Sequence, residues 1–190
     1  MELYIIRHGE TKWNSEKRLQ GRSDIELNEY GIELARITSE ALKDVKFDRI
    51  YSSPLKRAYE TAEILRGSRK LDIICDDRLK EMCFGIYEGV QDVTANGNSP
   101  IKILFTEPEK YIAVEGGESF KQLYDRTGDF LKEVIIPQVN DGENILIVGH
   151  GAMNCSIIAQ LRKTPLNNFW DGMTCLLYTS PSPRDLSTSR

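Results

Sequence analysis

The chain has 190 residues, of which 40% are hydrophobic and 28% charged, with a formal net charge of −4 at pH 7. These values are typical of one globular domain, and the acidic balance argues against a broad surface for nucleic acid or anionic membrane. The four cysteines form no CxxC pair, no apolar run is long enough to span a bilayer, and no signal peptide is recognisable, so we expect a cytoplasmic protein with reduced thiols.

Short apolar runs alternate with helical patterns along the chain. Strands are expected at residues 3–6 and within residues 47–54, 71–77 and 144–151. Helices are expected within residues 27–45, from Ser53 with Pro54 at the first helical position, from Ser119, and over residues 152–161. This alternation predicts a three-layer α/β/α sandwich around a mainly parallel sheet.

Two segments do not fit this alternation. Residues 80–118 lack clear periodicity, and we interpret about 90–117 as a small loop-rich cap insertion in a domain of residues 1–174. Residues 175–190 change abruptly to Ser, Thr, Pro and Arg, which is also typical of a disordered tail. We favour another interpretation, because CLLYTSPSPRD (175–185) resembles the translation of a transposase-type sequencing adapter, and we therefore expect residues 175–190 to be adapter read-through and not natural sequence.

The chain has two histidines, and both stand in the same local context. His8 lies in YIIRHG and His150 in LIVGHG, so each follows an apolar strand and precedes a glycine. A lone histidine at a strand end is more often structural than catalytic, but two in one context reverse those odds. Because ligands bind at the carboxyl ends of parallel strands, we expect both imidazoles in one crevice.

Two arginines accompany these histidines and suggest a phosphate site. Arg7 precedes His8, and Arg57 falls in the first turn of the helix after the second strand. Guanidinium groups bind phosphate oxygens bidentately, and an imidazole can attack phosphorus and hold the phosphoryl group covalently. The leaving alkoxide then needs an acid, and Glu81 and Glu88 are both candidates. Nothing in the chain suggests a metal site, and we expect no metal and no cofactor.

Six ordered motifs between Leu3 and about Trp170 resemble those of the histidine phosphatase superfamily, the phosphoglycerate mutase-like family. They are RHGETKWN, LQGRSDIELNEYG, SSPLKRAYETA, EMCFGIYEG, GGESF and VGHG. The resemblance implies that His8 is the phosphorylated nucleophile, that Arg7, Arg57 and His150 bind the phosphoryl group in transit, and that Glu81 is the general acid and base. It also implies substrate contacts at Gly9, Asn14, Gln20, Gly21 and Gly151, whereas we interpret Glu88 as a structural carboxylate.

The chain departs from the family pattern at two places. Relatives have one or more strands after the segment that contains Trp170, and here the adapter-like tail takes their place, so we expect the last strand or strands of the sheet to be missing. Cys155 stands where many relatives carry arginine, and we assign it no function.

The resemblance favours a phosphatase over a mutase. LQGRSD, FGIYEG and the short segment from Gly89 to Gly117 are typical of the phosphatase branch. Phosphoglycerate mutase-type transfer is the first alternative, and a non-catalytic phospho-ligand binding module is the second. The expected partner is a small phosphorylated metabolite, and its identity stays open among phosphorylated sugars or sugar acids, phosphoserine and α-ribazole phosphate. Whether the chain is a monomer or a dimer also stays open. Four basic residues can contribute to selectivity, although their interpretation as solvated side chains is stronger: Lys12, Arg22, Lys102 and Lys110.

Overall fold

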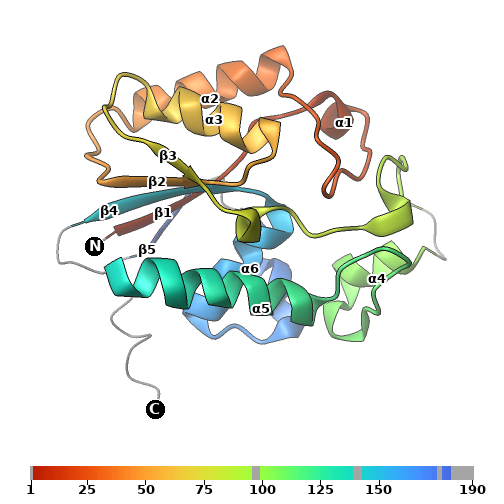
Figure 1. Ribbon diagram of the computed structural model, residues 1–190. Coiled ribbons are helices and arrows are strands. Elements are labelled where there is room, and N and C mark those ends of the chain that lie inside the picture. Colours follow the sequence, from red (N-terminus) through yellow and green to blue (C-terminus); the bar gives the residue numbers. More distant parts are fainter. Residues whose placement is uncertain (1, 96–98, 139–142, 175–176, 181–190) are drawn as a thin grey trace.

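The computed structural model describes residues 2–95, 99–138, 143–174 and 177–180, with side chains up to residue 171. Its centre is a sheet in the order β3-β2-β4-β1-β5 (Figure 1). The parallel strands are β1 (Glu2–Arg7), β2 (Arg49–Ser52), β3 (Ile73–Cys75) and β4 (Asn144–Gly149). The predicted, mainly parallel sheet is therefore confirmed.

Helices cover both faces of this sheet (Figure 1). One face carries α2 (Glu29–Ala41) and α3 (Lys56–Arg66), and the other carries α5 (Phe120–Phe130) and α6 (Gly151–Arg162). Successive side chains of a strand point to opposite faces, so Tyr4 and Ile6 of β1 pack with α3, whereas Leu3 and Ile5 pack with α6. This arrangement is the predicted α/β/α sandwich.

The remaining helices are short and lie mostly in the connections. They are α1 (Lys12–Ser15), η1 (Asp77–Leu79), η2 (Gly85–Tyr87), α4 (Pro100–Thr106), η3 (Pro108–Lys110), the π-helical η4 (Leu131–Ile135), η5 (Ile136–Gln138) and η6 (Leu166–Thr174). The sequence did not predict α4, which lies in the segment interpreted as loop-rich. Ser99 caps it and Pro100 starts it, but its seven residues give too short a pattern of apolar side chains for recognition.

The start of α3 differs from the prediction by two residues. The helix begins at Lys56, with Leu55 at the N-cap position and no side-chain cap. Ser53 has two other contacts: its Oγ accepts a hydrogen bond from the Leu55 N–H and lies 2.8 Å from His150 Nε2. Ser53 therefore belongs to the surroundings of His150 rather than to the end of α3.

The edge strand expected to be missing is present, which corrects that part of the sequence prediction. Strand β5 (Leu177–Ser180) pairs antiparallel with β1, in the segment interpreted as adapter-derived. The free edge of β1 offers backbone N–H and C=O groups to any extended segment, so this pairing does not depend on particular side chains. Cys175 and residues 181–190 lie outside the described residues.

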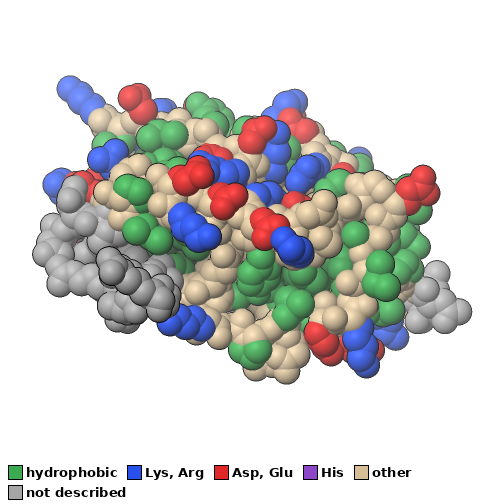
Figure 2. All heavy atoms as spheres, turned by 60° about the horizontal axis from the view of Figure 1, so that its bottom comes forward, with side chains coloured by type: hydrophobic (Ala, Val, Ile, Leu, Met, Phe, Trp, Pro, Cys, Tyr) green, Lys and Arg blue, Asp and Glu red, His purple; other side chains and the backbone are tan. Residues whose placement is uncertain are grey.

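Charged side chains of both signs are interspersed on the face of the molecule shown in Figure 2. That face carries no broad patch of a single sign. Within the described residues, no helix has the length and apolar character needed to cross a membrane.

Candidate active site

The two histidines lie side by side because β1 and β4 are neighbours in the sheet. Arg7 ends β1 opposite Gly149, which ends β4, and the backbone N–H of His8 donates to the Gly149 carbonyl at 2.9 Å. His150 follows as the N-cap of α6. The centroids of the two imidazole rings are 5.1 Å apart. The structure therefore brings both histidines to one edge of the sheet, as their sequence context indicates.

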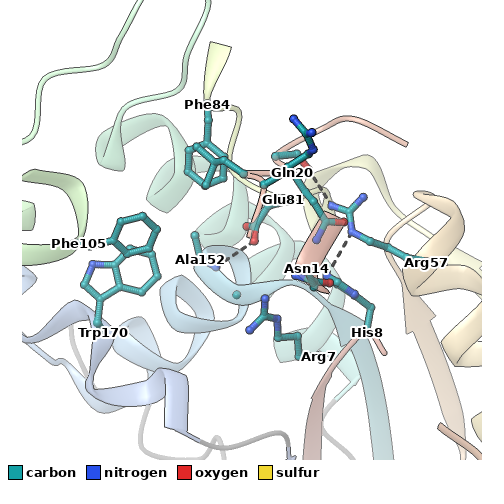
Figure 3. Close-up of a pocket in the computed structure, with 14 residues that line it drawn as sticks. Arg7, His8, Asn14, Gln20, Arg57, Glu81, Phe84, Phe105, Ala152 and Trp170 are labelled. Atoms are coloured by element: carbon teal, nitrogen blue, oxygen red, sulfur yellow. Dashed lines mark hydrogen bonds between the residues drawn. The ribbon is translucent and has the colours of Figure 1, made fainter. Parts of the chain in front are cut away.

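A cavity of about 110 Å³ opens beside His8 (Figure 3). Its lining comprises Arg7, His8, Asn14, Arg18, Leu19, Gln20, Gly21, Arg57, Glu81, Phe84, Phe105, Gly151, Ala152 and Trp170. Two of the residues expected to contact substrate are not part of this lining. His150 is fully buried next to His8, and Gly9 packs against the backbone of Gly31, whose carbonyl oxygen would lie 2.5 Å from a Cβ at position 9. Gly9 is therefore needed here for close packing of two backbone segments.

The contacts of His8 fix which of its nitrogens carries the proton. Its Nδ1 lies 2.6 Å from the Gly9 carbonyl oxygen, which can only accept, so the proton resides on Nδ1. Its Nε2 then holds the lone pair and accepts a hydrogen bond from Arg57 Nε at 3.2 Å. Burial, together with the charges of Arg57 and Arg7, holds the pKa of His8 well below its usual value, so the ring is neutral.

His150 is neutral for the same physical reasons. Burial is the largest cause of its lowered pKa, and the charges of Arg57 and Arg7 add to it. While its Nε2 contacts Ser53, its Nδ1 is buried without a hydrogen-bond partner among the described residues. An unpaired polar atom next to His8 is costly for the fold, which is more typical of a functional site than of a structural one.

Arg57 is fixed by the backbone of the loop before α2. Its Nη1 donates to the Ser23 carbonyl and its Nη2 to the Gly21 carbonyl, each at 2.8 Å, while its Nε donates to His8. The side chain is fully buried. Burial lowers the pKa of Arg57 to about 10, so the guanidinium remains protonated at neutral pH.

Arg7 presents the opposite case. It is half-buried, and within the described part of the chain its guanidinium makes no hydrogen bond and no ion pair. All of its donors are therefore available in the cavity that His8 also lines. A guanidinium held among buried groups without a partner is a binding site for an anion such as phosphate.

The Glu81 carboxylate lies at the N-terminus of α6. Its Oε1 accepts from the backbone N–H groups of Met82 and Met153, at 2.8 and 3.0 Å, and its Oε2 accepts from that of Ala152 at 3.2 Å. Since α6 has no cap from its own N-cap side chain, Glu81 satisfies these helix donors from another segment. Figure 3 shows the carboxylate in the middle of the cavity wall.

Asn14 and Gln20 line the same cavity as Arg7 and Arg57 and share contacts with Thr11. The Asn14 amide oxygen accepts from the Thr11 backbone N–H at 3.0 Å, which leaves the amide NH₂ group free to donate. The Thr11 hydroxyl lies 3.0 Å from the Gln20 amide oxygen. Both amides are thereby held at the cavity surface.

Glu88 has the structural role that the sequence indicated. Its carboxylate accepts from the backbone N–H groups of Arg22 and Ser23 at 2.9 Å, from the Ser23 hydroxyl at 2.8 Å and from the Phe84 N–H at 3.2 Å. These contacts tie the loop around Gly21 to the loop after Glu81. Gly21 itself has a positive φ of 56° next to this carboxylate, a conformation that favours glycine.

A buried ion-pair network supports the loop of Glu81 and was not predicted from the sequence. Glu118 accepts from Arg126 Nε at 2.7 Å and Nη2 at 3.0 Å, and from the Cys83 N–H at 3.3 Å. Arg22 donates to both Glu118 and the Glu81 carbonyl, which makes it a paired residue and not the freely solvated one expected. Glu118 is part of the GGESF motif, so the motif was the available signal.

The aromatic residues of the cavity were also missed. Phe84, Phe105 and Trp170 line it but come from a loop, from α4 and from η6, short segments in which a single aromatic residue carries no positional signal. Cys155, in contrast, is buried in the core of the α5–α6 face and does not line the cavity. Burial raises its pKa to about 12, so its thiol stays protonated. Within the described residues, no group of three or more metal-ligating side chains is arranged to hold a metal ion.

Comparisons with known proteins agree with this geometry. Residues 3–186 match the family model of the histidine phosphatase superfamily (branch 1). Phosphoglycerate mutase-like protein 4 of Arabidopsis thaliana is 36% identical over 165 residues, which cover 85% of this chain and 71% of that protein. Phosphoserine phosphatase 1 of Hydrogenobacter thermophilus is 33% identical over 172 residues, covering 90% and 80%. Among solved structures, Bacillus stearothermophilus YhfR has a TM-score of 0.81 and 35% identity, covering 89% of this chain and 83% of that one.

Proposed function

Because this chain belongs to the histidine phosphatase superfamily, we propose that it is a phosphatase that hydrolyses phosphomonoesters through a phosphohistidine at His8. The observation that carries the proposal is the unpartnered guanidinium of Arg7 in the cavity lined by the lone-pair nitrogen of His8. A half-buried cation without a partner among the described residues favours binding of an anion, and a neutral imidazole beside it can act as a nucleophile.

In the first step, His8 Nε2 attacks phosphorus, the N–P bond forms and the ester P–O bond breaks. Arg57 Nε must give up its hydrogen bond to His8 Nε2 and donate to a phosphoryl oxygen instead. Its two other hydrogen bonds, to Ser23 and Gly21, hold the guanidinium in place. Arg7 and the Asn14 amide donate to the remaining oxygens. The Gly9 carbonyl, which accepts from Nδ1, stabilises the positive charge that develops on the ring.

Glu81 acts as the acid of this step and as the base of the next. Its proton passes to the leaving alkoxide oxygen, and the free carboxylate then accepts a proton from the water that attacks the phosphohistidine. The N–P bond breaks, phosphate leaves the site, and the His8 ring returns to its neutral form. The backbone N–H groups of Ala152 and Met153 hold the Glu81 carboxyl group in place at the cavity wall for both steps.

Phosphoryl transfer of the mutase type is the second candidate, because the Arabidopsis relative is named phosphoglycerate mutase-like. Both reactions share the phosphohistidine and differ in whether water or a sugar acid takes the phosphoryl group. Incubation with 3-phosphoglycerate and a bisphosphoglycerate primer separates them. Isomer formed faster than inorganic phosphate is released would identify a mutase.

The mechanism is tested by trapping the phosphoenzyme. A rapid quench during turnover of a phosphomonoester is expected to give a base-stable, acid-labile adduct in the wild type and none in His8→Ala. The expected loss of phosphate release in His8→Ala is at least about 10³-fold, because the covalent route is removed. Ile112→Ala is the control, since Ile112 is 85% exposed and does not line the cavity. Active His8→Ala protein would refute the mechanism, and absence of any adduct would favour a binding module.

A further inference from the structure

The part of the cavity across from His8 and Arg57 is aromatic. Figure 3 shows Phe84, Phe105 and Trp170 on that side, with the Glu81 carboxylate between them and the histidine. In an in-line displacement the leaving oxygen lies opposite the attacking nitrogen. The alcohol part of a substrate attacked by His8 therefore points past Glu81 toward these rings.

The aromatic side is held rigidly by its own contacts. Trp170 donates its indole N–H to the Leu104 carbonyl in α4 at 2.7 Å. Its ring centroid lies 4.8 Å from that of Phe105 and 4.8 Å from that of Phe169. Since the one polar group of Trp170 is already satisfied, only apolar ring surface remains to meet a ligand.

Among the residues that the structure describes, no free cation on this side is available to a negatively charged group on the alcohol. Arg7, Arg18 and Arg57 are the cations that line the cavity. While Arg7 and Arg57 lie near His8, Arg18 donates its Nε to the Glu16 carboxylate at 2.7 Å and its Nη1 to the Gly89 carbonyl at 2.9 Å. A substrate carboxylate placed here would lose its hydration against aromatic carbon without gaining a free cation in exchange, which is unfavourable.

We infer that the preferred substrates are phosphomonoesters whose alcohol carries an uncharged aromatic or branched apolar group, and not esters with a carboxylate near the phosphate. This inference rests on the proposed hydrolase function and narrows its substrate class. It distinguishes the chain from its Hydrogenobacter relative, which is named for phosphoserine, a substrate that bears a carboxylate.

The experiment compares two primary alkyl esters, 2-phenylethyl phosphate and 2-carboxyethyl phosphate, so that the leaving alcohols have similar acidity. The phenyl ester is expected to have a kcat/KM at least about tenfold higher, the discrimination that one apolar pocket commonly provides. Trp170→Ala and Phe105→Leu are expected to lower the ratio of the two kcat/KM values at least threefold, because they remove ring surface that the phenyl group contacts. Ile112→Ala, an exposed residue of the 90–117 segment, serves as the control and keeps the full preference.

A binding measurement separates this inference from the proposed function. Isothermal titration of the wild type with 3-phenylpropylphosphonate and 3-carboxypropylphosphonate, neither of which can be hydrolysed, is expected to show at least about tenfold tighter binding of the phenyl compound. Equal or reversed affinities would overturn the inference, even if both esters are hydrolysed. Tighter binding of the phenyl compound without hydrolysis of either ester would support the inference and remove the hydrolase proposal.

Discussion

The two ends of the cavity are built by different means. At the phosphoryl end, Arg7 and His8 continue β1, and Arg57 is fixed by two backbone carbonyls. At the leaving-group end, Phe105 and Trp170 come from α4 and η6 and are held mainly by contacts between rings. The first end is as rigid as the sheet, whereas the second depends on side chains in connecting segments.

This difference indicates that the residues around His8 and the residues that select the leaving group can vary independently of each other. The sheet determines where its strand ends lie, so the positions of Arg7 and His8 cannot shift without a change in the sheet. Segments such as α4 can be replaced while the sheet is retained. Variants at the two ends should consequently differ in how their effects depend on the leaving group.

Glu81→Gln is expected to have the largest effect that depends on the leaving group. An amide cannot give a proton to the alkoxide, so the kcat for alkyl esters should fall by about 10²–10⁴-fold. Esters of p-nitrophenol leave without protonation and should lose much less of their rate. The measurement is a plot of kcat against the pKa of the leaving alcohol, and an equal loss for all esters would show that Glu81 does not act as the acid.

Arg7→Gln should lower kcat/KM by about 10²–10³-fold for every ester, because it removes phosphoryl contacts and none to the alcohol. Its free energy of unfolding should stay within about 0.5 kcal/mol of the wild type, since Arg7 has no intramolecular partner in the described residues. Chemical denaturation measures this quantity.

Arg57→Gln supplies the contrast with Arg7. It should lose activity and also about 1–3 kcal/mol of stability, because the buried Gly21 carbonyl and the partly buried Ser23 carbonyl lose their donors. Equal free energies of unfolding for the Arg7→Gln and Arg57→Gln variants would contradict the view that only Arg57 is fixed by contacts within the chain.

The smallest expected effect concerns acidic pH. Above about pH 6.5 the histidines are neutral in both the folded and the unfolded chain. Below this pH the two histidines bind protons in the unfolded chain but stay neutral in the folded chain, because burial and the nearby arginines lower the folded pKa values of His8 and His150. The free energy of unfolding should therefore fall with pH, by at most about 1.4 kcal/mol per pH unit for each histidine.

This titration can be followed by NMR, because the chain has only two imidazoles. Both should retain the signals of the neutral form at pH 6, and a midpoint near 6.5 for either ring would contradict the buried, neutral pair. The buffer and salt concentration are kept constant across the series, and the denaturation slope of His150→Gln serves for comparison.

The sequence predicted the strand-end residues well, for a physical reason. His8 and His150 each follow an apolar run, and the parallel pairing of β1 with β4 then leaves little freedom in their placement. Residues that were missed, such as Phe105 and Trp170, depend on long-range packing of connecting segments, and their positions in the sequence do not indicate which cavity they line. The start of α3 was misplaced because Ser53 contacts His150, a partner that is distant in sequence.

The C-terminal segment marks another limit of sequence reasoning. The segment that forms β5 was expected to form no strand, but an open edge of a sheet accepts almost any extended backbone. We propose that residues 175–190 are adapter-derived, and sequencing of the source locus tests this. A natural reading frame that encodes the same residues would refute it.

The bonds from Ala152 and Met153 to Glu81 connect turnover to the first turn of α6. If Glu81 gains and loses a proton in each cycle, these two amides alternate between a charged and a neutral acceptor. A neutral acceptor holds a backbone N–H less strongly, so the exchange of these amide hydrogens with solvent should quicken while the carboxyl is protonated. Deuterium uptake at the amides of Ala152 and Met153 would then report on the protonation state of the Glu81 side chain, which this measurement does not detect directly.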